Sequence, residues 1–247
     1  MNLRIVLILL AAFSVMGIGA GAALGQSGSG RGITTPTKNV TSTPAPQATP
    51  TPQAEVPRPT PPPGGNHEYA PIQEKTVNYK NWTLNDLANN KPTTLRSLMQ
   101  GKKLVMVLYF APWCPNWRNE APVAAKLYEK YKSQGFEIVG VGEYGTRTDV
   151  QAYFATSGGA PYPVVMESES RDEREKTAHF GYRQLTGDTR KWGSPWNIFL
   201  DPAKCNTTGD VLTEKAFIVN GELIEDEADK FIHDRLAANA VITPCKQ

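Results

Sequence analysis

The chain has 247 residues, which is enough for one folded domain with appendages. Its 26 basic and 24 acidic side chains give a net charge of +2, and this balance argues against a nucleic-acid partner. The sequence has three cysteines and no Cys-x-x-Cys or His–Cys spacing, so it indicates no metal site, and we expect no cofactor.

Residues 1–25 have the pattern of a secretory signal. Arg4 precedes an apolar stretch that runs to about residue 24, and the small residues Ala23 and Gly25 stand where a signal peptidase would cut. The stretch is just long enough to span a bilayer, so an uncleaved N-terminal anchor is the alternative to cleavage. We therefore expect an exported protein, periplasmic or extracellular, whose contact with a membrane is limited to such an anchor.

Residues 26–68 are dominated by Ser, Thr, Pro, Gly and Gln, with repeated Thr-Pro pairs. Such a composition cannot bury enough apolar surface to offset the entropy of ordering, so we predict a disordered linker that leans toward polyproline II. The folded domain is then expected at residues 69–247, which is long enough for one core.

The folded part alternates strand and helix patterns. A short strand at 82–84 and a helical turn at 94–99 precede an unbroken apolar run at 104–110, which is typical of a strand buried on both faces. Apolar residues then recur at helical spacing from Trp117 to Tyr131. A second buried strand at 136–142, a helix at 149–156, a short strand at 164–166 and a helix at 172–180 follow. The charged run at 167–176 mixes both signs and is expected to be a solvated face.

The C-terminal part predicts a different pairing. A strand at 197–200 precedes a hairpin in which 216–219 pairs with 222–224 through an Asn-Gly turn. A helix at 226–238 closes the chain. Parallel β-α-β units followed by an antiparallel hairpin and a helix predict an α/β fold, with a mixed central sheet and helices on both faces.

Cys114 lies at the junction between the buried strand at 104–110 and the first long helix. Pro115 follows in the first helical turn, where a missing N–H costs nothing. Free backbone N–H groups and the positive end of the helix dipole favour a thiolate over a thiol at this place. The sequence therefore predicts a reactive cysteine.

This order of elements resembles the thioredoxin fold, and more closely its TlpA/ResA-type branch, which borders the AhpC/TSA redoxins. In that family the central strand ends in F-W-A-x-W-C-x-x-C-R-x-E-x-P. The matching residues here are Phe110, Ala111, Trp113, Cys114, Arg118, Glu120 and Pro122.

Three later segments extend the resemblance. Residues 139–143 resemble the second core strand with its terminal carboxylate, Glu143, and residues 162–165 resemble the family's F-P-V-V element. Gly193-Ser194-Pro195 resembles the segment that carries a cis-proline beside the active site. The resemblance implies that Ser194 and Pro195 help to shape substrate docking, while Trp196 replaces a small polar residue and would narrow the groove.

Trp117 stands where the family has its second cysteine. A single thiol can form a mixed disulfide with a substrate but cannot resolve it alone. In our preferred interpretation, Cys114 is the nucleophile of a monothiol redox protein whose partners are protein or small-molecule thiols and disulfides. A peroxidase is the second interpretation, although the peroxiredoxin Pro and Thr are replaced by Val107 and Ala111. In the third, the site is degenerate and the domain is a binding or scaffold module in which Trp117 fills the old site.

The neighbours of Cys114 have alternative roles. The resemblance implies that Glu120 and Glu143 take part in proton transfer near the thiol, but an exposed Glu120 could simply favour the helix dipole. Trp113 and Trp117 are candidate substrate platforms, and half-buried packing explains them equally well.

Cys205 and Cys245 flank the last strands and helix of an expected exported protein. We predict a disulfide between them, which would pin the C-terminal tail to the insertion before residue 216. The alternative is that one of them is a distant resolving thiol for Cys114.

Overall fold

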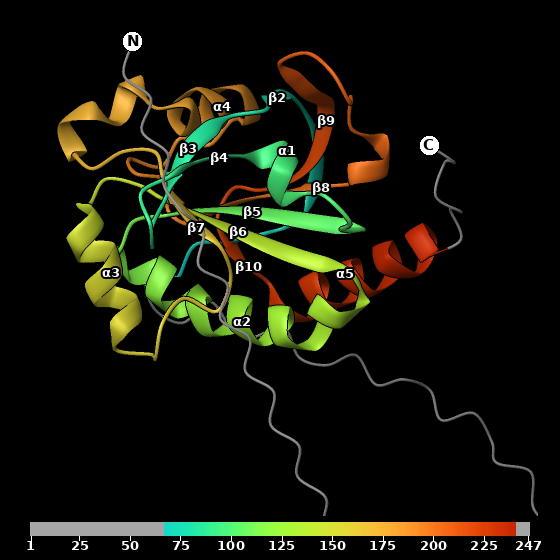
Figure 1. The fold of residues 1–247 in the computed structure, drawn as a ribbon, viewed down its shortest axis with the longest axis horizontal. Coiled ribbons are helices and arrows are strands. Elements are labelled where there is room, and N and C mark those ends of the chain that lie inside the picture. The colour runs from blue at the N-terminus through green and yellow to red at the C-terminus, as the bar shows by residue number, and fades with distance from the viewer. Residues whose placement is uncertain (1–66, 241–247) are drawn as a thin grey trace, which may run out of the picture. The chain divides into compact units, whose positions relative to one another are not determined.

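The computed structural model describes residues 67–240, which contain an eight-stranded mixed sheet with helices on both faces (Figure 1). The predicted signal and most of the predicted linker, as well as Cys245, lie outside the described residues, so these assignments stay predictions. Between residues 67 and 240, none of the helices combines the length and the apolar character needed to cross a bilayer.

The large sheet has the strand order β2-β9-β8-β5-β6-β7-β3-β4. Its strands are β2 (Gln73–Lys80), β3 (Thr83–Asp86), β4 (Pro92–Thr94), β5 (Leu104–Phe110), β6 (Phe136–Gly142), β7 (Val164–Met166), β8 (Trp196–Leu200) and β9 (Val211–Val219). The central strands β5, β6 and β7 are parallel to one another, and β8 joins β5 in the antiparallel sense. The predicted mixed sheet is therefore confirmed.

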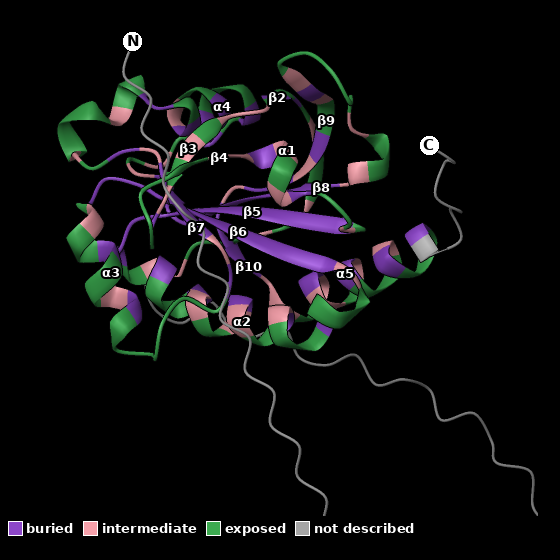
Figure 2. Cartoon of the chain, viewed as in Figure 1, coloured by how far each residue is buried: buried purple, intermediate pink, exposed green. Residues whose placement is uncertain are grey.

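The apolar strand β5 contributes side chains to two hydrophobic clusters, one on each face of the sheet. Leu104, Met106, Leu108 and Phe110 belong to one hydrophobic cluster, and the residues between them, Val105, Val107 and Tyr109, belong to a second cluster. Side chains alternate between the faces of a strand, so a strand covered on both sides must be apolar throughout. Figure 2 shows β5 and β6 buried along their whole length.

Helices cover both clusters (Figure 1). The first cluster lies under α2 (Pro115–Tyr131), α3 (Arg147–Ala155) and α5 (Glu225–Ala240), and the second under α1 (Leu95–Leu98) and α4 (Ala178–Thr186). Short 3-10 helices lie at Lys132–Gln134, Arg171–Lys176 and Pro202–Lys204. This layering places the start of α2 at the carboxyl end of β5, where Cys114 lies.

Two elements differ from the sequence prediction. The single helix expected at 172–180 is wrong, because Thr177 has an extended backbone and separates a 3-10 helix from α4, whose start it caps by accepting a hydrogen bond from Phe180 N. The chain does turn after β9, but β10 (Glu222–Leu223) pairs in parallel with β1 (Tyr69–Ala70) instead of with β9. The backbone N–H of Glu222 donates to the carbonyl of Glu68 at 2.8 Å. Residues at the start of the domain are therefore the pairing partner of β10, where the sequence predicted residues 216–219.

Candidate active site around Cys114

Cys114 is the N-cap residue of α2, and its side chain makes no capping bond to the helix. Its Sγ–H instead donates to the Ser194 carbonyl at 3.0 Å, and Ser194 Oγ accepts a hydrogen bond from Ala111 N at 2.8 Å. The thiol is 7% exposed. Only a protonated thiol can donate, so this hydrogen bond has to break before Cys114 reacts as a thiolate.

The Ser194–Pro195 peptide bond is cis, in the segment where the resemblance implied a cis-proline. Ser194, Pro195 and Trp196 are all buried, and Trp196 has no exposed surface. The Trp196 indole N–H donates to Asn220 Oδ1 at 2.8 Å, so this ring is fixed in the sheet. A role of these three residues in substrate binding stays a prediction. Because their side chains are buried, a substrate would have to contact their backbone atoms, or the segment would have to rearrange.

The two tryptophans beside the cysteine lie in different environments. Trp117 has no exposed surface, and its ring centroid lies 4.5 Å from that of Phe110 and 5.8 Å from that of Tyr153. Trp113 is half-buried, and its indole N–H donates to the Tyr144 carbonyl at 2.7 Å. Of the two candidate platforms, Trp113 keeps surface that a substrate could touch.

Glu120 is buried one turn into α2, so the alternative of an exposed carboxylate at the helix start is wrong. Its Oε2 accepts hydrogen bonds from Leu223 N at 2.7 Å and Asn197 Nδ2 at 3.3 Å. Burial raises the pKa of Glu120 to about 8, although these two hydrogen bonds act in the opposite direction. The carboxyl group can therefore hold or release a proton near neutral pH.

Glu143 follows β6 and has no exposed surface. Its backbone N–H donates to the Phe110 carbonyl, but neither carboxyl oxygen has a hydrogen-bond partner within residues 67–240. Burial and the neighbouring carboxyl of Glu167 both raise its pKa. Glu167 is itself occupied in accepting a hydrogen bond from Ala178 N at the start of α4. Burial and the nearby carboxyl of Glu167 therefore favour the neutral form of Glu143.

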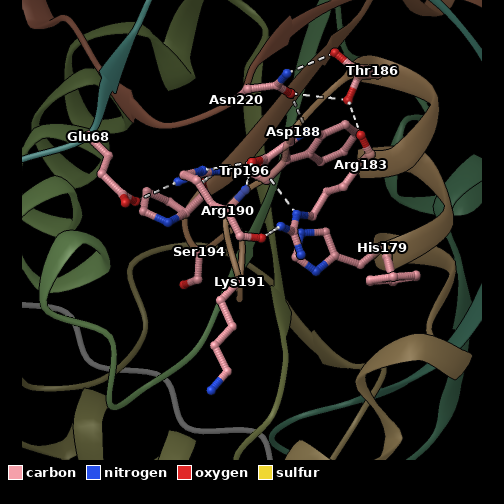
Figure 3. A network of polar contacts seen from close by, with 12 residues as sticks. Glu68, His179, Arg183, Thr186, Asp188, Arg190, Lys191, Ser194, Trp196 and Asn220 are labelled. Carbon is pink, nitrogen blue, oxygen red and sulfur yellow. Dashed lines mark hydrogen bonds and ion pairs between the residues drawn. The ribbon is translucent and has the colours of Figure 1, made fainter.

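A buried ion-pair network supports the cis-proline segment (Figure 3). Asp188 Oδ2 accepts from Arg183 Nε at 3.0 Å and from Arg190 Nη2 at 2.7 Å, and Arg190 Nη2 also donates to the Pro195 carbonyl at 2.9 Å. Burial opposes ionisation of Asp188, but hydrogen bonds from Arg190 and Arg183 and their charges outweigh it and lower the pKa of Asp188. A Cβ on Gly193 would overlap the Arg183 guanidinium, which explains the glycine here.

The network continues to the start of the described chain. Glu68 Oε2 accepts hydrogen bonds from Arg190 Nη1 at 3.2 Å and from Asn116 Nδ2 at 2.8 Å. Glu68 thus connects the first turn of α2 with the arginine that holds Pro195. Sequence reasoning missed Glu68, Asp188 and Arg190, because charged residues in loops are usually solvated and nothing in their spacing shows that they meet.

Cys205 is half-buried and lies in the insertion that precedes β9. Burial and the charge of Asp201 raise the pKa of its thiol to about 11. Cys205 borders a cavity of about 280 Å³ that is also lined by Phe231 and Arg235 of α5. Over residues 67–240, no cluster of three ligating side chains could hold a metal ion.

Comparison with known proteins supports a redoxin. The sequence model of the AhpC/TSA family matches residues 77–183. The thiol-disulfide oxidoreductase ResA of Bacillus subtilis is 35% identical over 89 residues, which cover 36% of this chain and 48% of that protein. ResA of Halalkalibacterium halodurans is 34% identical over 98 residues, covering 40% and 52%. A probable phospholipid hydroperoxide glutathione peroxidase of Helianthus annuus is 29% identical over 101 residues, covering 36% and 56%. The chain therefore spans about half the length of these relatives.

Solved structures with low sequence identity are also similar. A thiol:disulfide interchange protein of the thioredoxin family from Chlorobium tepidum has a TM-score of 0.45 at 22% identity, covering 70% of this chain and 99% of that one. A DsbF homologue from Corynebacterium diphtheriae has a TM-score of 0.45 at 17% identity, covering 70% and 95%.

Proposed function

Because the chain carries a TlpA/ResA-type redoxin domain of the AhpC/TSA family, we propose that it is an exported thiol-disulfide oxidoreductase that works through one local thiol, Cys114. Two relatives are named thiol-disulfide oxidoreductases, which supports this reaction class. Export rests on the signal-like pattern of residues 1–25. The observation that carries the proposal is the Cys114 thiol at the N-cap of α2, packed against the cis-proline segment.

The reaction needs two exchanges. In the first, the Cys114 thiol loses its proton, and the thiolate attacks one sulfur of a substrate disulfide. A Cys114–substrate S–S bond forms, the substrate disulfide breaks, and the leaving thiolate takes up a proton. In the second, the thiolate of an outside thiol attacks the substrate sulfur of the mixed disulfide, and Cys114 leaves as a thiolate that is protonated again. The outside thiol is required because Trp117 stands one turn after Cys114, where a resolving cysteine would be needed.

Glu120 and Glu143 are the proposed proton carriers of this site. The raised pKa of Glu120, about 8, lets it exchange a proton near neutral pH, and burial favours the protonated form of Glu143. Proton removal from Cys114 also has to break its hydrogen bond to Ser194. The first exchange is therefore expected to be slower than for an exposed thiolate.

Mass spectrometry tests the proposal. The intact protein is incubated with oxidised glutathione, digested under non-reducing conditions and searched for glutathione on each cysteine. We expect an adduct on Cys114 that a small thiol removes, and no such adduct in Cys114→Ser. The Cys205→Ser variant is the matched control, because it should keep the Cys114 adduct even though it frees Cys245 from the predicted disulfide. Adducts on Cys205 or Cys245 alone would contradict the proposal.

Two competing functions give different results in the same assay. A peroxidase, which the Helianthus annuus relative brings into consideration, would form a sulfenic acid on Cys114 with a peroxide faster than it forms the glutathione adduct. A binding or scaffold module would leave Cys114 unmodified by both reagents. The burial of Cys114 and of Trp117 is the observation that favours the module as the second candidate.

A further inference from the structure

A cluster of two tryptophans and an arginine lies next to Cys114. The rings of Trp113 and Trp192 meet edge to face, with centroids 5.2 Å apart and planes at 81°. The guanidinium carbon of Arg171 lies 3.9 Å from the centroid of the Trp113 ring and 6.0 Å from that of Trp192. A cation–π contact of this kind holds the arginine in place without neutralising its charge.

Further cations surround this cluster of Trp113, Trp192 and Arg171. Arg174 and Lys191 lie 5.5 Å and 5.4 Å from the centroid of the Trp192 ring. Two cavities, of about 490 and 460 Å³, meet at Arg171, and one of them is also lined by Trp113 and the other by Trp192. Their lining includes five cationic side chains, namely Arg118, Arg171, Arg174, Lys176 and Lys191.

The carboxylates near these cations do not satisfy them all. Asp149, which lines the same cavity as Arg171, accepts hydrogen bonds from the backbone and hydroxyl of Thr146 in the cap of α3. Glu175 pairs with Arg174 at 2.6 Å. Within residues 67–240, Arg171 and Lys191 form no ion pair at 4.0 Å or less. The charge of Arg171 contributes to the lowered pKa of Asp149, and Asp172 lines the cavity beside Lys191, but neither carboxylate contacts these cations directly, so both cations can still bind a ligand.

We propose that the surface formed by Trp113, Arg171, Arg174, Lys191 and Trp192 binds an acidic peptide segment of the protein that exchanges disulfides with Cys114. This inference rests on the proposed function and names the substrate class for it. A guanidinium held over an aromatic ring can bind carboxylates in a bidentate manner, and the ring contact lowers the entropic cost of binding. Two open cavities on either side of one cation suit an extended chain with several carboxylates better than one small anion.

The position of Trp113 connects binding with the reaction. Trp113 directly precedes Cys114, and its indole is fixed by the hydrogen bond to the Tyr144 carbonyl. A peptide whose carboxylates lie on Arg171 therefore has its neighbouring residues close to the thiol. Holding the two reacting groups together in this way raises the rate of exchange for acidic partners over neutral ones.

The first experiment measures exchange rates with the full chain. Three peptides carry the same single cysteine, as its mixed disulfide with cysteamine, and differ only in having acidic, neutral or basic flanking residues. We expect the acidic peptide to react fastest, with a preference that declines as salt is added. Arg171→Glu and Lys191→Glu should each slow the acidic peptide about threefold to tenfold, while leaving the neutral peptide within about twofold.

The matched control is Lys215→Glu. Lys215 is exposed on β9 and lines the cavity beside Cys205, so its substitution changes the net charge equally without touching the surface around Trp113. It should leave all three rates unchanged. An equal loss in Lys215→Glu would show that only the net charge matters and would overturn the inference.

A second experiment separates this inference from the proposed function. A cysteine-free acidic peptide is titrated into Cys114→Ser, and binding is followed by tryptophan fluorescence. If Arg171→Glu weakens this binding, the inference is supported, even if no peptide reacts with Cys114 and the proposed exchange fails. Equal reaction of all three peptides together with no binding here would overturn the inference and leave the exchange intact. Binding to anionic phospholipid vesicles without discrimination among the peptides would overturn it too.

Discussion

Trp117 sets what Cys114 can do. Its indole fills the core beneath the first turn of α2 and packs against Phe110, with no exposed surface. A cysteine in its place would leave a cavity, and such large-to-small changes in a core cost about 3–5 kcal/mol. The tryptophan is thus a structural part of this domain, and a second thiol cannot be restored there without a loss of stability.

Glu120 gives the domain a pH-dependent stability. Its folded-state pKa of about 8 lies above the model value of 4.5, so the unfolded chain ionises first as the pH rises. The contribution of Glu120 is fully present below about pH 4.5, and this contribution should fall by about 1.4 kcal/mol per pH unit from there to pH 8, in addition to any loss from the raised pKa of Glu143.

Urea unfolding at pH 5, 6.5 and 8 measures this slope. Glu120→Gln keeps the shape of the side chain and cannot ionise, so its stability should change less across this range than that of the wild type. A wild type and a variant with parallel pH profiles would show that Glu120 is ionised in the folded protein.

The segment between α4 and β8 is held by a buried ion-pair network as well as by the packing of Trp192. Arg183 and Asp188 are each 1% exposed, and Arg190 ties Asp188 to the Pro195 carbonyl. Asp188→Asn removes one charge and leaves the Arg183 cation buried without its counterion. Breaking a buried pair in this way costs about 3–5 kcal/mol.

The measurement compares Asp188→Asn with Glu225→Gln by urea unfolding at pH 7. Glu225 pairs with Lys126 at the surface, where the Lys126 side chain is 69% exposed and the Glu225 side chain 42%, so its loss should cost much less than the loss of Asp188. Because its folded-state pKa is lowered, Asp188 contributes above the unfolded value of 3.8, and its contribution is lost as the pH falls through the lowered value. Similar losses in the two variants would contradict a special role for the buried pair.

The sequence predicted elements well where a pattern is local. The unbroken apolar run at 104–110 and the motif around Cys114 were sufficient to predict β5 and the start of α2. The cis geometry of the Ser194–Pro195 bond was also predicted from a motif. The pairing of β10 with β1 was not predictable, because each strand has two residues and their partner lies about 150 positions away. The burial of Glu120 depends on the same pairing, since Leu223 of β10 is its hydrogen-bond donor.

At the scale of the whole molecule, the proposed Cys205–Cys245 disulfide would close the chain around β9 and α5. Cys205 borders the same cavity as Phe231 and Arg235 of α5, and Ala240 ends that helix five positions before Cys245. A loop of about 40 residues closed by a disulfide stabilises a fold by roughly 4 kcal/mol.

Non-reducing digestion with mass analysis checks this pairing on the protein purified from the exported fraction. We expect a peptide that links Cys205 with Cys245, and Cys114 that remains open to alkylation. The Cys205→Ser variant should lower the melting temperature and release a free Cys245. A peptide that links Cys114 to either cysteine would instead identify a distant resolving thiol.

Glu68 has a mechanical consequence. The described chain begins at His67, whose ring lies 3.0 Å from Glu222 Oε2 and 3.2 Å from Asn119 Nδ2. The hydrogen bonds of Glu68 to Asn116 and Arg190 and the two-residue ladder between β1 and β10 follow directly. A load applied to the chain ahead of His67 would reach these contacts before it reached the eight-stranded sheet. It would therefore pull first on the turn that follows Cys114 and on the arginine that holds Pro195, so tension would change the shape of the thiol site well before the domain unfolds.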